Sequence, residues 1–376
     1  MPKRIERVLI VGAGMAGLTL AISLRRQGLN PDIVERQPAW PVHGAGIYLV
    51  GNAMRALGSL NLANEVLQNG SAIRFQTLLD ARGRQLAVID TESVWAKCGP
   101  CVGIRRASLQ SILVKALGDT EVKFGTTVTA LTQQQDSAVV KFGNGSELAY
   151  DLVVGADGVR SSIRGHLFGN VQPRFCGQVG WRFLVRCPQK ITGWTLFAGY
   201  RGVFLIIPVG GDQAYCYADA VVDKPFDDPI EGRLERLKLR FASYASPVPE
   251  ALAELKSFEQ IHFGAIEDIL QQPWSAGNSL LIGDAAHATS PNMASGAAMA
   301  FEDALVLSNL IASGREVAQL QSDFTSQRQS RIRWVHEQTH RRDQIRSLPT
   351  FVRDLMTRLL ANKVYRANYA PLVEEI

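Results

Sequence analysis

VLIVGAGMAG, residues 8–17, decides the fold of this 376-residue chain. Its first four residues are aliphatic and predict a short buried strand, and Gly12, Gly14 and Gly17 follow at the spacing G-x-G-x-x-G. Gly12 permits a tight turn, Gly14 lets the backbone approach a pyrophosphate, and Gly17 lets a helix pack closely on the strand. The stretch therefore predicts a strand, a phosphate-binding turn and a helix.

The residues that follow complete a dinucleotide-binding unit. Residues 18–27 have helical periodicity, Gly28 ends the helix, and residues 31–34 predict a second strand that leads into Glu35. An acid about 20 residues after the turn is placed to accept hydrogen bonds from a ribose, and the positive end of the helix faces the phosphates. Together these features predict that the chain binds a dinucleotide.

The composition is that of an ordinary folded protein. Hydrophobic residues make up 46% and charged residues 20%, and the net charge of +5 is too mild to identify a nucleic-acid binder. Five cysteines, an odd number, do not indicate a disulfide scaffold, so we expect a cytoplasmic protein. The glycine triplet inside the first apolar run argues against a secretory signal or a transmembrane helix.

The order of the patterns predicts an α/β fold with two interlocked domains, because 376 residues exceed what one core usually serves. Residues 180–222 alternate like antiparallel strands separated by glycine turns, whereas residues 279–282 return to the buried type of strand. We assign residues 1–74, 100–178 and 274–325 to a Rossmann-like dinucleotide-binding domain, residues 75–99 and 179–273 to a smaller domain with a mixed or antiparallel sheet, and residues 326–376 to C-terminal helices.

Two short motifs have competing interpretations. Cys98 and Cys101 have the spacing of a redox pair, but they lead into a strand and not into the helix start that would lower a thiol pKa, which favours a plain loop. His336 and His340 form H-E-x-x-H, which on a helix is typical of zinc sites. No third ligand is evident and the adjacent arginines would repel a dication, so we expect a solvated helix without metal. Nucleic-acid binding is disfavoured because no aromatic residues are interleaved with those arginines.

Three stretches together resemble the FAD-dependent aromatic hydroxylases, the single-component flavoprotein monooxygenases typified by para-hydroxybenzoate hydroxylase. The resemblance covers most of residues 5–325. It rests on the turn at residues 12–17 with Glu35-Arg36, on Ala156-Asp157-Gly158, and on Gly283-Asp284-Ala285-Ala286-His287 with Pro291, Gly296 and Glu302-Asp303-Ala304. It implies that the larger domain binds FAD and that the smaller one binds the substrate.

The resemblance implies contacts to each half of FAD. The amides of Met15 and Ala16 would meet the pyrophosphate, Glu35 the adenosine ribose, and Arg36 with the backbone of Val128 the adenine. The flavin ring would contact Gly46, Ile47, Gly296 and Ala297, and Asp284 would hold a ribityl hydroxyl. Arg105 would reach the ribityl or pyrophosphate region, and Asp157 would contact FAD. Of these, Asp157 belongs to a family element that is linked to NAD(P)H as well as to FAD.

The resemblance also implies a reaction. NADH or NADPH, as a transient co-substrate, would reduce FAD, and O2 would form a flavin C4a-hydroperoxide that hydroxylates a small aromatic or heteroaromatic substrate. Pro291 would shape the wall near C4a. Arg201, Tyr215 and Tyr217 of the smaller domain are our candidates for holding a substrate oxyanion or phenol. We expect a monomer or homodimer. The alternative is a non-hydroxylating FAD protein, namely a reductase, a halogenase or a flavin-binding interaction protein.

Two further expectations concern local backbone structure. Members of the resembled family usually have Gly-Gln-Gly where this chain has Ala294-Ser295-Gly296, and alanine lacks the left-handed freedom of glycine, so we expect a differently shaped loop beside the flavin. In the smaller domain, Asp228 is followed by Pro229, which predicts that Asp228 caps a helix.

Overall fold

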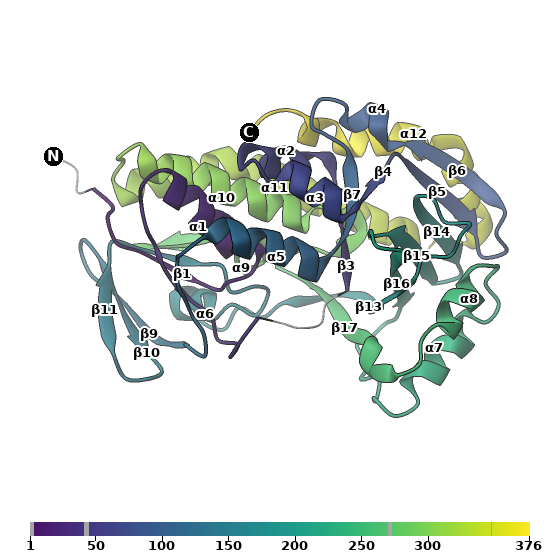
Figure 1. Ribbon diagram of the computed structural model, residues 1–376, viewed down its shortest axis with the longest axis horizontal. Helices are drawn as coiled ribbons and strands as arrows, with labels where there is room; N and C mark the ends of the chain where they lie inside the picture. The colour runs from purple at the N-terminus through teal and green to yellow at the C-terminus, as the bar shows by residue number, and fades with distance from the viewer. Residues whose placement is uncertain (1–3, 41–44, 270–272, 347) are drawn as a thin grey trace.

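The computed structural model describes residues 4–40, 45–269, 273–346 and 348–376 (Figure 1). It confirms the predicted strand, turn and helix: β1 (Val8–Val11) leads into α1 (Met15–Arg26), which returns to β2 (Asp32–Val34). β1 pairs in parallel with both β2 and β12 (Leu152–Gly155), as crossover helices require. The sheet has the order β18-β19-β12-β1-β2-β8, with β18 (Ser275–Ala276), β19 (Ser279–Leu281) and β8 (Val122–Lys123).

A second sheet of seven strands confirms the predicted mixed sheet. Its order is β17 (His262–Asp268), β13 (Arg174–Arg186), β16 (Gln213–Val221), β15 (Gly202–Pro208), β14 (Trp194–Gly199), β5 (Phe75–Asp80) and β6 (Gln85–Asp90). All neighbours are antiparallel except β14 and β5. A hydrophobic cluster joins one face of this sheet to α7 (Arg233–Phe241) and α8 (Val248–Ala253).

The predicted cap of α7 is wrong. α7 begins at Arg233, after Gly232 in the left-handed conformation. Asp228 is instead buried, where its carboxylate accepts hydrogen bonds from Trp181 Nε1 and Arg236 Nε, both at 2.8 Å. Because these donors come from β13 and from α7 itself, Asp228 ties the helix to the sheet.

A small sheet interlocks the two larger ones. It has the order β3 (Gly46–Leu49), β7 (Cys101–Arg105), β4 (Ser71–Ile73). A Cβ atom on Gly46 would lie 2.3 Å from Tyr215 Cβ, and one on Gly103 would lie 2.2 Å from the Pro208 oxygen. The backbone of the small sheet thus packs against a side chain of the seven-stranded sheet at Gly46 and against its backbone at Gly103. The exact domain boundaries stay a prediction.

The remaining elements cover these sheets. A third small sheet consists of β9 (Val128–Gln133), β10 (Ala138–Phe142) and β11 (Glu147–Tyr150). The shorter helices are α2 (Gly51–Ser59), α3 (Ala63–Asn69), α4 (Thr91–Trp95), α5 (Arg106–Leu117), α6 (Ser162–Phe168) and α9 (Asp284–His287), with 3-10 turns η1 (Phe258–Gln260) and η2 (Pro291–Met293). None of the helices within the described ranges has the length and apolar character needed to cross a bilayer.

Three long helices run together along the upper side of Figure 1: α10 (Gly296–Ala312), α11 (Val317–Arg346) and α12 (Thr350–Val373). The expectation that α11 is a solvated helix is wrong. Its Arg328 is fully buried and donates hydrogen bonds to Glu302 Oε2 and Asp303 Oδ1, each at 2.8 Å. The buried acids of α10 therefore explain why Arg328 of this arginine-rich helix is buried.

Candidate active site

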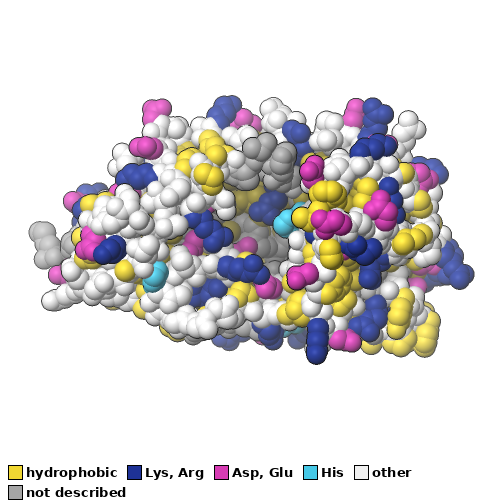
Figure 2. Space-filling model, turned by 90° about the horizontal axis from the view of Figure 1, so that it is seen from below, with side chains coloured by type: hydrophobic (Ala, Val, Ile, Leu, Met, Phe, Trp, Pro, Cys, Tyr) yellow, Lys and Arg dark blue, Asp and Glu magenta, His cyan; other side chains and the backbone are white. Residues whose placement is uncertain are grey.

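A cavity of about 1800 Å³ lies between the parallel sheet and the seven-stranded sheet. A smaller hollow of about 200 Å³ adjoins it, and the two share Gly14, Met15, Arg106 and Ala107 in their walls. Glu35 lines the smaller hollow and Asp284 the larger one. A continuous crevice thus runs from Glu35 past the glycine turn to Asp284. Figure 2 shows the molecule hollowed near its middle, with Lys and Arg side chains at the hollow.

The glycine turn has the geometry that its spacing predicts. Gly12 has φ +107°, and a Cβ there would lie 2.5 Å from the Ala156 oxygen. A Cβ on Gly17 would lie 2.0 Å from the Gly12 oxygen, whereas one on Gly14 would meet nothing within 4 Å. In the described part of the chain no side chain caps α1, and its first turn has no acid. Its amides are therefore open to an anionic ligand.

Glu35 is held against this turn. Its Oε2 accepts a hydrogen bond from the Ala13 amide and its Oε1 one from the Gln37 amide, both at 2.9 Å. The Glu35 carbonyl accepts from the Thr126 amide at 2.9 Å, two residues before Val128. Arg36 is exposed beside them. Residues predicted for the adenosine half therefore come together at one end of the crevice.

Residues predicted for the flavin half line the larger cavity. Asp284 is exposed in the first turn of α9, and a Cβ on Gly296 would lie 3.8 Å from its Oδ1. Within the described residues, the N-terminus of α10 has neither a side-chain cap nor an acid in its first turn. Gly46, Ile47 and Arg105 line the same cavity from β3 and β7. A second uncapped helix start thus faces the site.

A buried ion-pair network holds the α9 turn in place. Asp303 Oδ2 accepts hydrogen bonds from the Gly283 amide at 2.9 Å and from His287 Nε2 at 2.6 Å, and Oδ1 accepts from Arg328. Burial by itself would raise the pKa of Asp303, but His287 and Arg328 outweigh it and lower that pKa to about 2. His287 is a satisfied, buried positioning residue.

The carboxylate of Asp157 accepts hydrogen bonds from residues of its own turn. It accepts hydrogen bonds from Ser161 Oγ at 2.5 Å, from the Ser162 amide at 2.7 Å and from Ser162 Oγ at 2.8 Å. These contacts shape the turn before α6, and the neighbouring Gly158 lines the cavity. A contact of Asp157 with either nucleotide stays a prediction.

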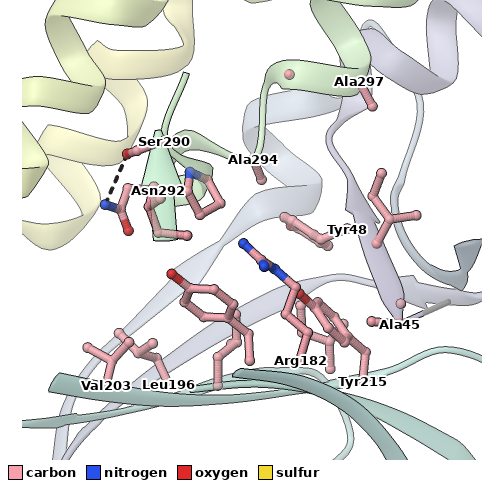
Figure 3. Close-up of a pocket in the computed structure, with 18 of the residues that line it drawn as sticks. Ala45, Tyr48, Arg182, Leu196, Val203, Tyr215, Ser290, Asn292, Ala294 and Ala297 are labelled. Atoms are coloured by element: carbon pink, nitrogen blue, oxygen red, sulfur yellow. Dashed lines mark hydrogen bonds between the residues drawn. The ribbon is translucent and has the colours of Figure 1, made fainter. Parts of the chain in front are cut away.

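The seven-stranded sheet supplies an arginine between two tyrosines. Arg182 on β13 lies opposite Tyr217 on β16, with its guanidinium carbon 5.5 Å from the Tyr217 ring centre. Figure 3 shows Arg182 beside Tyr215, rising from the sheet toward Ala294. Tyr217 Oη is buried and has no hydrogen-bond partner among the described residues. Burial raises the pKa of both phenols, so they are neutral donors beside a cation.

The prediction that Arg201 helps to hold the substrate is wrong. Arg201 lies in the turn between β14 and β15, outside the cavity, and its side chain pairs with the exposed Asp223 at 2.9 Å. Arg182 lines the cavity instead, beside the Tyr217 ring. The sequence placed Arg182 in a strand, but its position opposite Tyr217 depends on strand register, which a single sequence does not reveal.

The loop before α10 keeps a left-handed residue. Pro291 begins the 3-10 turn η2 and lines the cavity together with Ala294. Ala294 has φ +49° and ψ +29°, the conformation that glycine adopts most easily. The chain thus adopts this conformation in spite of the Cβ atom, and a loop shaped differently from that of family members stays a prediction.

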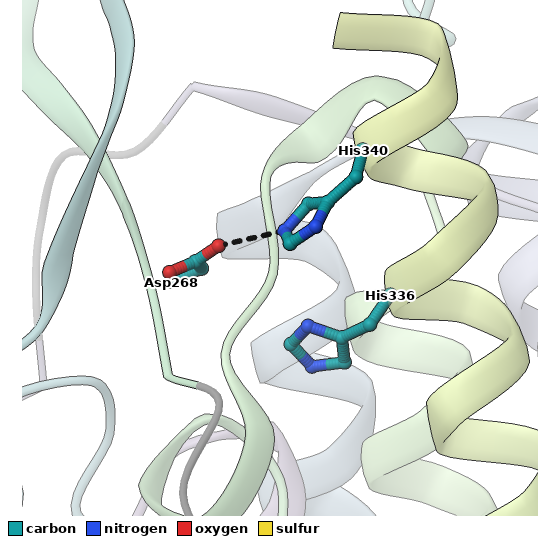
Figure 4. Close-up of side chains that lie close together, drawn as sticks. All are labelled: Asp268, His336 and His340. Carbon is teal, nitrogen blue, oxygen red and sulfur yellow. Dashed lines mark hydrogen bonds and ion pairs between the residues drawn. The ribbon is translucent and has the colours of Figure 1, made fainter.

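The H-E-x-x-H histidines meet a third polar group (Figure 4). His336, His340 and the buried Asp268 of β17 offer ligand atoms within 4.8 Å of one another, contrary to our expectation that no third ligand exists. Arg174, however, lies 2.7 Å from Asp268 Oδ2 and 3.0 Å from His340 Nε2. Burial lowers the pKa of His336 to about 4. We assign the group to an ion-pair network between β17 and α11.

The Cys98–Cys101 pair is not activated. Cys101 begins strand β7, and burial raises the pKa of its thiol to about 12, the opposite of what a redox nucleophile needs. Burial also raises the pKa of Cys98. These thiols are therefore protonated at neutral pH.

Comparison with known proteins points to one family. The family described as "FAD binding domain" matches residues 6–339. The chain is 33% identical to an aurachin C monooxygenase/isomerase of Stigmatella aurantiaca, over 81% of this chain and 80% of that protein. It is 29% identical to 2-heptyl-3-hydroxy-4(1H)-quinolone synthase of Pseudomonas aeruginosa, over 88% and 87%. The structure of Klebsiella pneumoniae HpxO with FAD and uric acid superposes with a TM-score of 0.89 at 24% identity, covering 98% of this chain and 97% of that one.

Proposed function

This chain belongs to the FAD binding domain family, and from that premise we propose how its cavity binds cofactor and substrate. It is an FAD-dependent monooxygenase, an oxidoreductase that uses NAD(P)H and hydroxylates a small aromatic or heteroaromatic compound. The alternative of a non-hydroxylating flavin protein has less support. We propose O2 as the source of the oxygen atom, with Arg182 and the two tyrosines orienting the substrate.

The crevice fits FAD in shape and in charge. Two uncapped helix starts, those of α1 and α10, face it, and each offers free amides and a partial positive charge. The first would hold the pyrophosphate and the second the electron-rich edge of the flavin, with Glu35 and Asp284 holding the sugar hydroxyls. When bound, FAD supplies the redox chemistry: it takes a hydride from NAD(P)H and activates O2.

The protein itself binds the cofactor and the substrate, orients them and excludes water. The cavity exceeds the range of about 300–1000 Å³ that is typical of single-ligand pockets, so it has room for the cofactor and a second molecule. Its tyrosine-lined floor places Arg182 opposite Ala294 and the start of α10 (Figure 3). A substrate oxyanion or carbonyl would accept hydrogen bonds from Arg182 and from the unpartnered Tyr217 hydroxyl, which would turn the ring toward the flavin.

The arginine between two tyrosines is the observation that carries the substrate proposal. A planar aromatic ring with one anionic or carbonyl oxygen matches this polar set. The part of the cavity wall that β5, β6, β14 and α12 contribute is largely apolar, and we call it the apolar arm. The arm is lined by Leu78, Leu86, Ile89, Leu196, Met356 and Leu360. We therefore propose that the substrate ring carries an apolar substituent that lies in this arm.

We also propose a cellular compartment and an oligomeric state for the enzyme. The five cysteines are free, which agrees with a reducing, cytoplasmic compartment. We propose a monomer or a homodimer, and light scattering on the purified yellow protein distinguishes the two.

Substitution of Arg182 tests the site. A panel of phenols, hydroxybenzoates, pyridinols, quinolones and purines is screened for substrate-stimulated NAD(P)H consumption and a product heavier by one oxygen. With the best substrate, Arg182→Met is expected to raise KM about 10- to 100-fold, because a charge-assisted hydrogen bond contributes about 1.5–3 kcal/mol. Its FAD content should be unchanged.

Arg201→Met is the matched control, because Arg201 is an arginine in a turn between two strands of the same sheet and lies outside the cavity. Its KM should equal that of the wild type. An unchanged KM in Arg182→Met would rule out the proposed role of Arg182, and no flavin reduction by NADH or NADPH would favour the non-catalytic alternative.

A further inference from the structure

The outer face of α12 exposes an apolar stripe. Phe351, Leu355 and Leu359 are 76%, 56% and 72% exposed, and their spacing of four residues places them on one side of the helix. An isolated exposed leucine is unremarkable in a folded protein, but three large apolar side chains in a row on one helix are not. The stripe is a surface that water covers at a cost in free energy.

The same helix has a basic exposed face. Arg358, Lys363 and Arg366 are exposed, and the one acid of α12, Asp354, pairs with Arg353 at 2.9 Å. Apolar side chains flanked by cations, with that single acid paired, are a combination that suits an anionic lipid surface. A protein partner of this chemistry would have to be both apolar and acidic, so the charge pattern favours the lipid.

Neighbouring elements extend the stripe. Arg353 donates hydrogen bonds to the carbonyls of Ala198 and Gly199, which brings the exposed Tyr200 close to the start of α12. Asn362 donates to the carbonyl of the exposed Val88 on β6 at 3.0 Å. In Figure 1, α12 runs along the outer edge of the molecule beside β6. A strand and a turn next to α12 thus also expose large apolar side chains.

The inner side of the same helix forms the wall of the cavity. Met356, Leu360 and Val364 line the apolar arm and are themselves partly open to solvent. One helix therefore separates the arm from the outside, with apolar side chains on both of its sides. Apolar side chains of α12 therefore face both the outer stripe and the cavity.

We propose that α12 docks the enzyme on an anionic membrane surface through Phe351, Leu355 and Leu359, and that the lipophilic substrate enters the apolar arm from that side. Docking of this kind is peripheral and reversible, because three side chains and three charges reach only the interfacial layer. The entry route rests on the proposed function, whereas the docking itself does not.

Vesicle binding tests the docking. The FAD-loaded protein is sedimented with vesicles of phosphatidylcholine alone or with 30% phosphatidylglycerol, at low and high salt. Wild type is expected to bind the anionic vesicles at least tenfold more tightly, and salt should weaken that binding. The triple variant Phe351→Ser, Leu355→Ser, Leu359→Ser should lose at least tenfold of the affinity, since each side chain adds buried apolar area.

Two further variants show whether vesicle binding depends on this stripe and on its neighbouring positive charges. Leu239→Ser on α7 is the matched control, because Leu239 is 76% exposed but lies on another helix, so its binding should equal that of the wild type. Arg358→Glu with Lys363→Glu should also lose at least tenfold on anionic vesicles and keep its FAD. Equal binding of the triple variant and the wild type, or no wild-type binding, overturns the proposal.

A second copy of the chain is the competing occupant of the stripe. If light scattering shows a wild-type dimer that the triple variant converts to a monomer, the stripe is a dimer interface and the membrane proposal is wrong. Because sedimentation measures binding without turnover, its failure and a failure of the proposed hydroxylation are distinguished. For entry, the triple variant should lower turnover of vesicle-dissolved substrate and leave turnover of a water-soluble analogue unchanged.

Discussion

Ala294 shows how one residue stores strain next to a site. Its φ of +49° costs a residue with a Cβ atom about 1–2 kcal/mol relative to the right-handed region. Ala294→Gly is expected to raise the free energy of unfolding by about 0.5–1 kcal/mol, because relief of this strain exceeds the added freedom of the unfolded chain. Chemical denaturation of the FAD-loaded protein measures it. Ala297→Gly, in a right-handed helix, should instead lower stability.

The low pKa of Asp303 predicts that the protein loses stability at acid pH. Since His287 and Arg328 hold its pKa near 2, below the ordinary value for aspartate, the stabilisation is complete above about pH 4 and is lost as the pH falls toward 2. Asp303→Asn should cost about 3–5 kcal/mol at pH 7, because Arg328 loses a buried partner. Urea unfolding between pH 7 and pH 2.5 measures both effects.

The control for this experiment is Asp223→Asn, because Asp223 forms an exposed ion pair. It should leave stability and its acid dependence nearly unchanged. A variant at Asp303 that retains the full acid dependence of the wild type would contradict the assignment.

Individual site residues could be predicted where chain distance alone fixed them. Glu35 follows the glycine turn by one helix and one strand, so its position was evident from chain distance, whereas Asp284 was implied by the family resemblance. Arg182 was not evident, because its place beside Tyr217 depends on the pairing of β13 with β16. Strand register is a long-range property, whereas the turn is a local one.

At the scale of elements, the open start of α10 predicts two opposite effects of one charge. Ala297→Asp places a carboxylate in the first turn, where it should stabilise the helix in the cofactor-free protein by about 0.3–1 kcal/mol. The same charge would face the flavin and should weaken FAD binding at least tenfold. Titration of FAD and unfolding of the apoprotein measure the two effects. Ala297→Asn controls for size, and an equal loss of FAD in both variants would mean that charge is not the cause.

Elements with a simple pattern could be predicted, and elements defined by a partner could not. The runs at residues 8–11, 152–155 and 279–281 are apolar throughout and form the buried parallel strands. α11 is rich in arginine and looked solvated, but Glu302 and Asp303 draw Arg328 into the core. The helix cap predicted at Asp228 was wrong for the same reason, since one of its hydrogen-bond donors, Trp181, comes from a distant part of the chain.

At the scale of the whole molecule, Arg346 joins the C-terminal helices to the seven-stranded sheet. It pairs with the buried Asp219 of β16 and donates a hydrogen bond to Gln178 Oε1 at 2.8 Å. Burial alone would lower the pKa of Arg346, but Asp219 raises it, so the guanidinium stays charged.

Arg346→Met should therefore destabilise the protein by about 3–5 kcal/mol, since Asp219 stays buried without its partner. It should also reduce the product formed per NAD(P)H consumed, because this part of the cavity wall loosens while the glycine turn is unaffected. Calorimetry and coupled product analysis measure the two effects. Arg341→Met, an exposed position on the same helix, should change neither.

The two-lobed arrangement followed from the order of strand types along the chain, but the way the lobes meet did not. Nothing in the sequence showed that Gly46 packs against the Tyr215 side chain or Gly103 against the Pro208 backbone. At both positions a Cβ atom would overlap the seven-stranded sheet. A substitution at either glycine would therefore force the small sheet away from the seven-stranded one and change the shape of the cavity that both sheets line.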